Sequence, residues 1–523
     1  MLLNSRITRV VIALTFALVA FGGMALAQDT DTVVIWTPGD AKFATEDLQV
    51  AEANRLLQMI EESTNTQIEI VQISWDGYGD RLRAAAASGE LPDIFSYYQH
   101  NDKNLITQFA EDGLILPFNG DLASLLPTVL TEYEGTPFTS ELNVDGNIYM
   151  RPSTWGGGTQ PNLSLVHVRQ DVLDTLGLAQ PETFEDFANY LTQCQEATGM
   201  NGLVFPGGEA SIFYVNVFAG AFGLPFQGWV RTDNGFESPL IQAGMRDGLL
   251  ILRQMIADGL VDPVTWELTN GNEAKERFIA GSNCAMLFNG GPIDLEIQAA
   301  LETNVPDAVQ LTLPALTTGD GVRGYTMEPQ WATATFIAGL PNNHPEAAAR
   351  VLDYLTTAEF ARLSVLGIEG VHYDMVDGQV QLNEEARLQD GFRPTSDTVF
   401  GAHPLAGGVM VDWLNAWRDA EAYEVYIGWG KSSEAVERYN TWQENAGMYQ
   451  IEAFGMFSST PALAEYQPTL NEIVIRDFLS IIRADTAEEA TTLFDTFVQS
   501  WLSAGGQQVQ DEMSAYLLEV YGN

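Results

Sequence analysis

The chain has 523 residues and a formal net charge of −46, from 24 Lys and Arg against 70 Asp and Glu. A chain of this length is too long for one compact core, so at least two lobes are expected. The acidic balance excludes the basic surface with which proteins bind nucleic acids or anionic membranes. Because the acidic residues are scattered and form no tail, we interpret the charge as a property of the solvated surface.

Residues 1–27 are typical of a secretory signal peptide. Arg6 and Arg9 precede an apolar run, and Ala25-Leu26-Ala27 supplies a cleavage site before Gln28. A membrane anchor is the alternative, but the run is short for spanning a bilayer. No Cys follows the run, so the sequence offers no attachment site for a lipid anchor. We therefore expect an exported protein, periplasmic or extracellular, whose mature chain is soluble.

From residue 30 to residue 98 predicted strands alternate with predicted helices. The segments "DTVVIWTPGD", "TQIEIVQISW" and "PDIFSYY" predict strands, and helices are expected over 47–62 and 78–88. This order predicts a parallel sheet covered by helices. Each strand ends in aromatic residues, which are Trp36, Trp75, Tyr97 and Tyr98.

Ligands of open α/β sheets bind outside the carboxyl ends of the strands, which favours a ligand site at these rings over simple core packing. Tyr97 and Tyr98 are adjacent, so only one of them faces the ligand if the strand is regular, and the pattern does not say which. His100, two residues further on, is a candidate ligand residue whose alternative is a structural histidine.

The segment "VDGNIYMRPSTWGGG" at 144–158 predicts a turn at Asp145-Gly146, a strand, and then Trp155 before three glycines. No Lys-Ser/Thr pair follows the glycines, so a crossover or close-approach turn is favoured over a phosphate loop. Further strands and helices are expected at 161–178, 181–199, 240–258, 272–292, 307–316 and 331–339. From residue 344 onward the pattern is mainly helical.

Cys194 and Cys284 are the only cysteines. Export permits a disulfide, but the spacing leaves a disulfide and two buried thiols equally open. With five His and two Cys the sequence shows no metal-ligand cluster and no cofactor motif.

Five segments resemble one family. They are "YGDRLRAAAASGELPDIF", "VDGNIYMRP", "RFIAGSNCAMLFNGGP", "HPEAAARVLDYL" and "GIEGVHYDM". In this order, behind a signal peptide, they resemble the extracellular solute-binding proteins of ABC sugar importers, the group that includes maltose- and alginate-oligosaccharide-binding proteins. The resemblance extends over nearly all of residues 30–520.

The resemblance implies an α/β protein with the two-lobed periplasmic-binding-protein fold, in which hinged parallel-sheet lobes close around a ligand and the C-terminal region is helical. We expect the first lobe over 28–152 plus 309–340, and the second over 153–308 plus 341–523. The implied function is capture of a carbohydrate, expected to be an oligosaccharide, and its delivery to the permease subunits of an ABC transporter. We expect a monomer that needs no cofactor.

A sugar site combines aromatic rings, on which the C–H faces of the sugar stack, with a few polar groups for the hydroxyls. Arg151 and Arg323 are near crossovers and would suit a carboxylated sugar, although such residues more often form salt bridges. The expected ligand-binding residues are Trp36, Trp75, Tyr97, Tyr98, His100, Trp155, Asn289, Trp331, Glu369, His372 and Tyr373.

The chain departs from the family pattern at one segment, and two other functions compete with this prediction. Some large members of the family have a calcium loop, but "QEATGMNGLVFP" at the corresponding place has only Glu196 as an acidic ligand, so we expect no calcium there. A secreted glycosidase or lyase would use a similar aromatic site, but no catalytic carboxylate pair or other catalytic signature is recognisable. A peptide, polyamine or metal binder would need a localised acidic cluster, which the sequence lacks.

Overall fold

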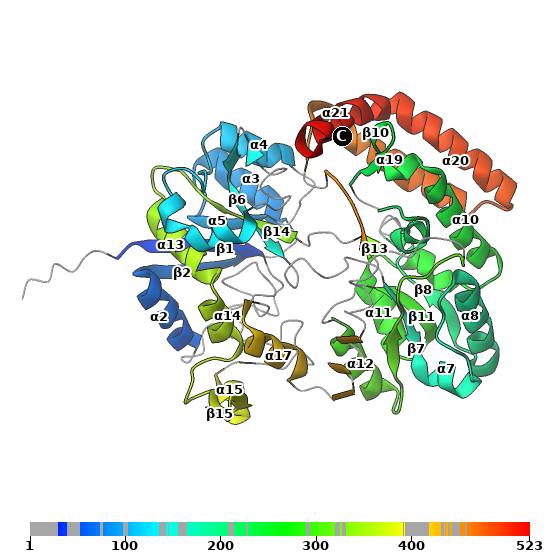
Figure 1. The fold of residues 1–523 in the computed structure, drawn as a ribbon, viewed down its shortest axis with the longest axis horizontal. Coiled ribbons are helices and arrows are strands. Elements are labelled where there is room, and N and C mark those ends of the chain that lie inside the picture. Colours follow the sequence, from blue (N-terminus) through cyan, green and yellow to red (C-terminus); the bar gives the residue numbers. More distant parts are fainter. Residues whose placement is uncertain are drawn as a thin grey trace, which may run out of the picture.

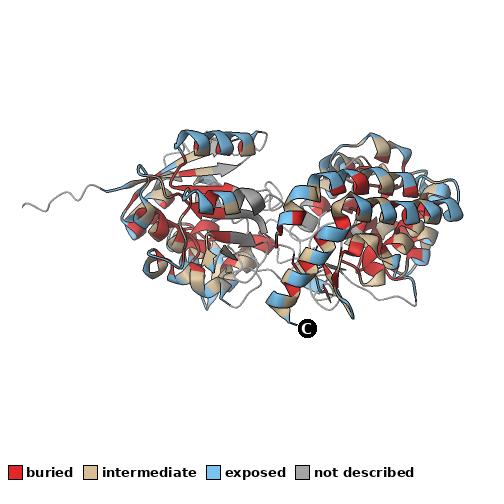
Figure 2. Ribbon diagram, turned by 90° about the horizontal axis from the view of Figure 1, so that it is seen from above, coloured by how far each residue is buried: buried red, intermediate tan, exposed pale blue. Residues whose placement is uncertain are grey.

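The structure is a computed structural model, and it describes residues 30–38, 53–73, 77–97, 103–134, 143–144, 146–154, 165–207, 214–225, 228–288, 293–319, 325–326, 331–390, 392, 418–429, 433–434, 436–437, 440–441, 450–455 and 458–522. Figure 1 shows two α/β halves side by side, each built on its own sheet. In Figure 2 the buried residues gather inside each half, and the outer faces of the helices are exposed. The α/β, two-lobed fold predicted from the sequence is confirmed.

The first half is built on a five-stranded sheet of order β2-β1-β3-β14-β6. Strands β1, β2 and β3 are parallel, and β14 runs antiparallel to both β3 and β6. The strands are β1 Thr32–Pro38, β2 Gln67–Ile73, β3 Ile94–Tyr97, β6 Met150–Thr154 and β14 Trp331–Ile337. The helices of this half are α2 Ala53–Thr64, α3 Tyr78–Ser88, α4 Lys103–Glu111, α5 Pro127–Tyr133, α13 Pro345–Leu355 and α14 Ala358–Val365.

Local sequence explains the boundaries of these elements. Val33 and Ile35 alternate along β1 and are buried in the core of the first half, and Trp36 lies on the opposite face of the strand. Helix α3 ends at Gly89, whose φ of 72° is left-handed and whose N–H bonds to the carbonyls of the last turn. The predicted helix over 78–88 is therefore confirmed residue for residue. The predicted start of the earlier helix, at 47, lies outside the described residues.

The second half is built on a four-stranded sheet of order β12-β7-β11-β8. Its strands are β7 Leu165–Arg169, β8 Asn201–Val204, β11 Asn283–Phe288 and β12 Gln310–Thr312. All six residues of β11 are buried, because helices cover both faces of this sheet. One face packs against α8 Phe184–Thr198, and the core on this side continues through α10 Ala243–Ala257 to the C-terminal helices α19 Pro461–Ile482, α20 Ala487–Trp501 and α21 Gln507–Tyr521. The other face packs against α11 Gly271–Ile279 and α12 Ile293–Asn304.

The smaller elements complete the two halves. In the second half these are α7 Gln170–Leu176, α9 Asn216–Ala219 and the hairpin β9 Val230–Thr232 with β10 Gly235–Glu237. In the first half they are the hairpin β4 Asn143–Val144 with β5 Asn147–Ile148, the hairpin β15 Tyr373–Val376 with β16 Gln379–Leu382, and helices α15 Glu384–Gln389 and α17 Ala420–Gly428. Strand β13 Tyr325–Thr326 pairs in parallel with β17 Gln450–Ile451 between the halves.

For two segments, the predicted lobe and the observed half differ. Strand β12, expected in the first lobe, pairs with β7 of the second sheet. Helices α13 and α14, expected in the second lobe, pack in the core of the first half. Strand β12 has only three residues, and its place depends on partners far away in the chain.

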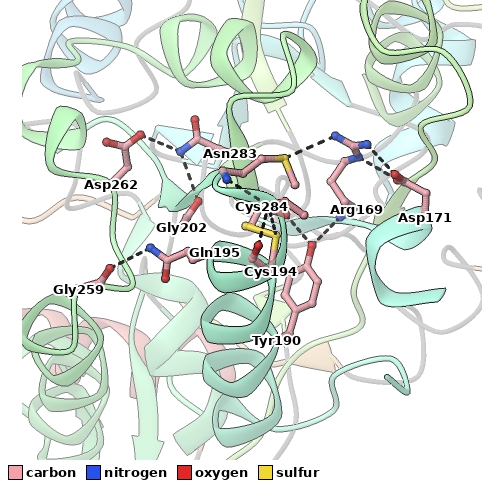
Figure 3. Close-up of a disulfide and its surroundings, with 12 residues drawn as sticks. Arg169, Asp171, Tyr190, Cys194, Gln195, Gly202, Gly259, Asp262, Asn283 and Cys284 are labelled. Atoms are coloured by element: carbon pink, nitrogen blue, oxygen red, sulfur yellow. Dashed lines mark hydrogen bonds and ion pairs between the residues drawn. A yellow bond between two sulfur atoms is a disulfide. The ribbon is translucent and has the colours of Figure 1, made fainter. Parts of the chain in front are cut away.

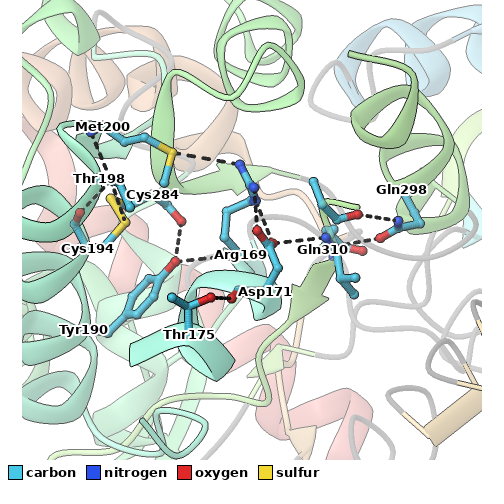
Figure 4. A network of polar contacts seen from close by, with 12 residues as sticks. Arg169, Asp171, Thr175, Tyr190, Cys194, Thr198, Met200, Cys284, Gln298 and Gln310 are labelled. Atoms are coloured by element: carbon cyan, nitrogen blue, oxygen red, sulfur yellow. Dashed lines mark hydrogen bonds and ion pairs between the residues drawn. A yellow bond between two sulfur atoms is a disulfide. The ribbon is translucent and has the colours of Figure 1, made fainter. Parts of the chain in front are cut away.

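A network of polar contacts fixes β12 in the second sheet (Figure 4). The N–H of Gln310 donates to Oε1 of Gln298 at 2.7 Å, which ties the strand to α12. The N–H of Val309 donates to Oδ1 of Asp171 at 3.0 Å. The Asp171 carboxylate also accepts hydrogen bonds from the Arg169 guanidinium. The local pattern of residues 307–316 does not predict these long-range bonds.

We expect Gly202→Ala to destabilise the second half by about 3 kcal/mol, because the new methyl group has no room. A Cβ at this position in β8 would lie 2.0 Å from the backbone carbonyl oxygen of Leu260. Gly428→Ala is the control, since a Cβ there meets nothing within 4 Å and the residue has no positive φ. Urea unfolding of the two variants measures the difference, and equal midpoints would contradict the predicted clash.

Candidate functional site

The carboxyl ends of four strands meet at one edge of the first sheet. In β1 and β2 the last residues, Pro38 and Ile73, are register partners. Strand β3 is parallel to β1, and β6 has the same direction because both run antiparallel to β14. Thr154 at the end of β6 pairs with Trp331 at the start of β14. This edge, called the first edge below, is where an α/β sheet presents ligand-binding side chains.

Three of the predicted ligand residues have backbone positions at the first edge. Trp36 lies near the end of β1, Tyr97 is the last residue of β3, and Trp331 is the first residue of β14. Trp75, Tyr98, His100, Trp155 and Asn289 lie outside the described residues. Strand β2 ends two residues before Trp75, β3 ends directly before Tyr98 and β6 directly before Trp155. That these residues bind the ligand stays a prediction.

Trp36 is the residue of the first edge whose surroundings the structure shows best. Its side chain is half-buried and packs against the core of the first half. The Arg81 guanidinium, from the first turn of α3, lies 5.1 Å from the centroid of the indole ring. Helix α3 starts soon after β2 ends, so the chain itself carries Arg81 to this edge. Part of the ring is therefore covered by a cation, a contact that the sequence did not predict.

The second sheet has a corresponding edge, called the second edge below. Strands β8, β11 and β12 share one direction, and their carboxyl ends lie beside the start of β7. Phe288 ends β11 directly before Asn289, and it pairs with Leu165 of β7. Phe205 directly follows β8. Aromatic residues thus follow or end the strands at this edge too.

An aromatic cluster surrounds the end of β11. The rings of Phe205 and Tyr214 lie 6.1 Å apart, and those of Phe205 and Trp266 lie 6.3 Å apart. A Cβ at Gly271 would lie 2.7 Å from the Tyr214 hydroxyl oxygen and 2.8 Å from the Phe288 ring, so glycine lets the two rings approach the first turn of α11. Burial raises the pKa of Tyr214 to about 12. A neutral phenol of this kind suits hydrogen bonding to a sugar hydroxyl.

Lys275 lies on the same helix, α11, one turn beyond Gly271. Its Nζ atom is 5.4 Å from the centroid of the Phe288 ring. Arg81, Tyr214 and Lys275 were not predicted from the sequence. The pattern that predicts a helix does not show which strand end a residue of that helix will contact.

The chain crosses between the two edges. Residues 155–164 join the end of β6 to the start of β7, and residues 313–330 join the end of β12 to the start of β14. A third connection leaves α17 and reaches β17, which pairs with β13 inside the second connection. Figure 1 places β13 and the start of β14 toward the middle of the molecule. Each edge is therefore joined to the other one, as expected for two lobes that face each other.

The predicted residues Glu369, His372 and Tyr373 lie at the start of the β15–β16 hairpin, and Tyr373 belongs to the same apolar cluster as Leu165 of β7. His372 is buried; its Nδ1 accepts the N–H of Ile368 at 2.9 Å, and its Nε2 lies 2.6 Å from the Asp390 carboxylate. Tyr373 is buried, and its hydroxyl accepts a hydrogen bond from Nε of Arg362 at 3.0 Å. Glu369 is exposed. The contacts of His372 are those of a structural histidine.

The structure describes one of the two arginines that were considered for a carboxylated sugar. Arg151 is fully buried in β6, opposite Thr335 of β14, inside the first sheet. Arg323 lies outside the described residues.

Comparison with known proteins agrees with this arrangement. The model of the family described as bacterial extracellular solute-binding protein matches residues 49–361. The chain belongs to this family. The matched range runs from the segment before α2 into α14, so it includes the whole second sheet and every strand of the first sheet except β1.

Individual solute-binding proteins resemble the chain over most of its length. The polygalacturonan/rhamnogalacturonan-binding protein YtcQ of Bacillus subtilis is 21% identical over 477 residues, which cover 88% of this chain and 87% of that protein. The alginate-binding protein AlgQ2 has a TM-score of 0.67 at 15% identity, covering 94% of this chain and 98% of that one. The N-glycan transport solute-binding protein NgtS of Streptococcus pneumoniae has a TM-score of 0.64 at 14% identity, covering 94% and all of the two chains. The structural likenesses show a shared fold.

A search for membrane-spanning helices among the described residues finds none that is both long and apolar enough to cross a bilayer.

Proposed function

We propose that this solute-binding protein captures a carbohydrate between its two halves and delivers it to the permease of an ABC transporter. The observation that carries the proposal is the aromatic character of both joined edges, with Trp36 and Trp331 on one and Tyr214 and Phe288 on the other. Aromatic rings beside a few polar groups are what a sugar site needs. The named ligands of the relatives, which are polygalacturonan, alginate and N-glycan, support a carbohydrate and differ in kind.

The proposed site combines predicted residues with residues found at the two edges. Rings of the first edge hold one face of the sugar while groups of the second edge bind the other, so the ligand stabilises the closed arrangement of the halves. We leave Glu369, His372 and Tyr373 out of the site. The proposed ligand-binding residues are Trp36, Trp75, Tyr97, Tyr98, His100, Trp155, Asn289 and Trp331, joined by Arg81, Tyr214 and Lys275.

The lobes follow the two sheets and cores. We propose that the first lobe comprises residues 30–154 with 331–429, and the second residues 165–319 with 450–522. Residues 155–164, 320–330 and 430–449 then contain the hinge connections. This division moves β12 and helices α13 and α14 from the lobes that sequence alone gave them.

We further propose export with removal of residues 1–27, and action as a monomer outside the cytoplasm. The description of the family as extracellular supports export. The protein is proposed to bind without chemistry, so an oligosaccharide should be recovered unchanged after incubation with it.

Titration with a panel of oligosaccharides tests the function. A bound sugar should change tryptophan emission, raise the melting temperature and lower the radius of gyration in small-angle scattering, because closure brings the halves together. Product formation from any sugar of the panel would instead support a glycosidase or lyase. If no sugar moves any of the three signals, the proposed function is wrong.

A further inference from the structure

Each of the two edges carries a cation that lies over an aromatic ring. At the first edge the Arg81 guanidinium is 5.1 Å from the centroid of Trp36, and at the second edge Nζ of Lys275 is 5.4 Å from the centroid of Phe288. Both rings belong to the carboxyl ends of strands, Trp36 in β1 and Phe288 in β11. The same pair of groups thus stands on both sides of the proposed ligand site.

Positive charge is scarce in this chain, which makes its location informative. The sequence has 24 Lys and Arg against 70 Asp and Glu, and only four of the cations are lysines. In such a chain most cations are expected to meet a carboxylate. Several arginines of the described residues do so, in the pairs Arg83–Asp80, Arg169–Asp171, Arg246–Asp247, Arg277–Asp262, Arg362–Asp419, Arg418–Glu132 and Arg476–Asp477. A second group, which includes Arg231, Arg387 and Arg483, lies over aromatic rings.

Arg81 belongs to the second group, and its ring lies at the first edge. Its side chain is exposed, and among the described residues it makes the contact with Trp36 and no ion pair. Arg83, two residues further along the same helix, pairs with Asp80 at 3.0 Å. The indole ring holds the Arg81 guanidinium at the edge while leaving its N–H groups for another acceptor.

We propose that the ligand is anionic, a uronic-acid oligosaccharide whose carboxylates bind Arg81 on the first half and Lys275 on the second. This inference rests on the proposed function and names the class of sugar. A guanidinium binds a carboxylate through two parallel hydrogen bonds, and an ammonium binds it as a point charge. Because the two cations belong to different halves, carboxylates on neighbouring sugar units favour the closed arrangement. The net charge of −46 repels anions at long range, so a local cation on each half is what such a ligand requires.

Calorimetric titration of the full mature chain with trigalacturonate, trimannuronate and their methyl esters tests the inference. The free acids should bind, and the uncharged esters should bind at least about tenfold more weakly. Arg81→Gln should weaken binding of the acid by about 10- to 100-fold, and Lys275→Gln by about tenfold. Both variants should weaken binding of the free acids more than binding of the esters, because only the acids lose a charge pair.

Matched variants separate ligand binding from folding. Arg83→Gln, on the same helix as Arg81, and Arg476→Gln, on the exposed face of α19, each remove one positive charge from a pair away from the rings, so acid binding should stay within about twofold. Arg81→Lys keeps the charge and should retain part of the affinity. Melting curves establish that each variant is folded.

The outcomes distinguish this inference from the proposed function. If neutral oligosaccharides bind and the free acids bind no better than their esters, the uronate inference is wrong and sugar binding stands. If the acids bind but Arg81→Gln and Lys275→Gln behave like the two controls, the assignment to these cations is wrong. If nothing in the sugar panel binds, the proposed function itself fails.

Discussion

Replacing Cys194 by alanine together with Cys284 by valine should lower the free energy of unfolding of the second half by about 4 kcal/mol. The two residues form a disulfide between α8 and β11, with a sequence separation of 90 and a Cα–Cα distance of 6.2 Å. Opening a loop of this length gives the unfolded chain far more freedom, which is the main source of the loss. Thermal melting should show it as a shift of about 10 °C in the transition of the second half.

The Tyr190 hydrogen bond beside the disulfide does not depend on the sulfur atoms, so the loss of stability should come from the missing cross-link (Figure 3). Both cysteines are fully buried, and the Tyr190 hydroxyl donates to the backbone carbonyl of Cys284 at 2.8 Å, a bond that does not need the sulfur. Alanine suits the helix and valine the strand, so the variant keeps the apolar packing. A reducing agent should lower the melting temperature of the natural chain and leave that of the variant unchanged. Equal melting of the two chains without reductant would contradict the predicted stabilisation.

The open question of the cysteines shows where sequence reasoning ends. Cys194 lies on the buried face of α8 with Phe187 and Leu191, and Cys284 lies in a strand that is buried throughout. Both facts are readable as apolar patterns, and they predict burial. Pairing requires that this helix cover this strand, which is a property of the assembled half.

The sequence likewise predicted individual strands and helices better than it predicted how they pair. Strands β1, β2 and β3 and helix α3 were predicted because alternation, helical spacing and a terminal glycine are local signals. The position of β12 beside β7 depends on bonds to Asp171 and Gln298, which no window around the strand contains. Lobe boundaries predicted from chain order therefore failed at β12, α13 and α14.

The residues of the candidate site also fall into those that local patterns predicted and those that they did not. Trp36 was predicted from its place at the end of a strand, a rule that follows from parallel sheets in general. Arg81 and Lys275 were missed, because each meets its ring from a helix that packs beside a strand end. His372 and Tyr373 were selected through a resemblance between segments, and the structure shows them bonded to Asp390 and Arg362.

Asp93→Ala should cost the first half about 3 to 4 kcal/mol of unfolding free energy. The carboxylate is buried just before β3 and accepts the N–H of Val34 in β1 at 2.8 Å and the N–H of His344 at 2.6 Å. His344 is the N-cap of α13, so the negative charge also stabilises the positive end of that helix. Alanine would leave two backbone donors without an acceptor. Urea unfolding should show an earlier transition of the first half and an unchanged one of the second.

Asp80→Ala is the matched control, because its carboxylate is exposed and its ion-pair partner among the described residues is Arg83 on the same helix, so the loss should stay below about 0.5 kcal/mol. Asp93→Asn should fall between the two, since the amide keeps one acceptor oxygen and places its NH2 group against the other donor. Asp93 belongs to the Pro-Asp-Ile segment by which the chain resembles its family. If Asp93 acts only through the fold, the folded fraction of Asp93→Asn should bind its sugar with unchanged affinity. A loss of affinity in fully folded Asp93→Asn would show instead that the segment contributes to the ligand site.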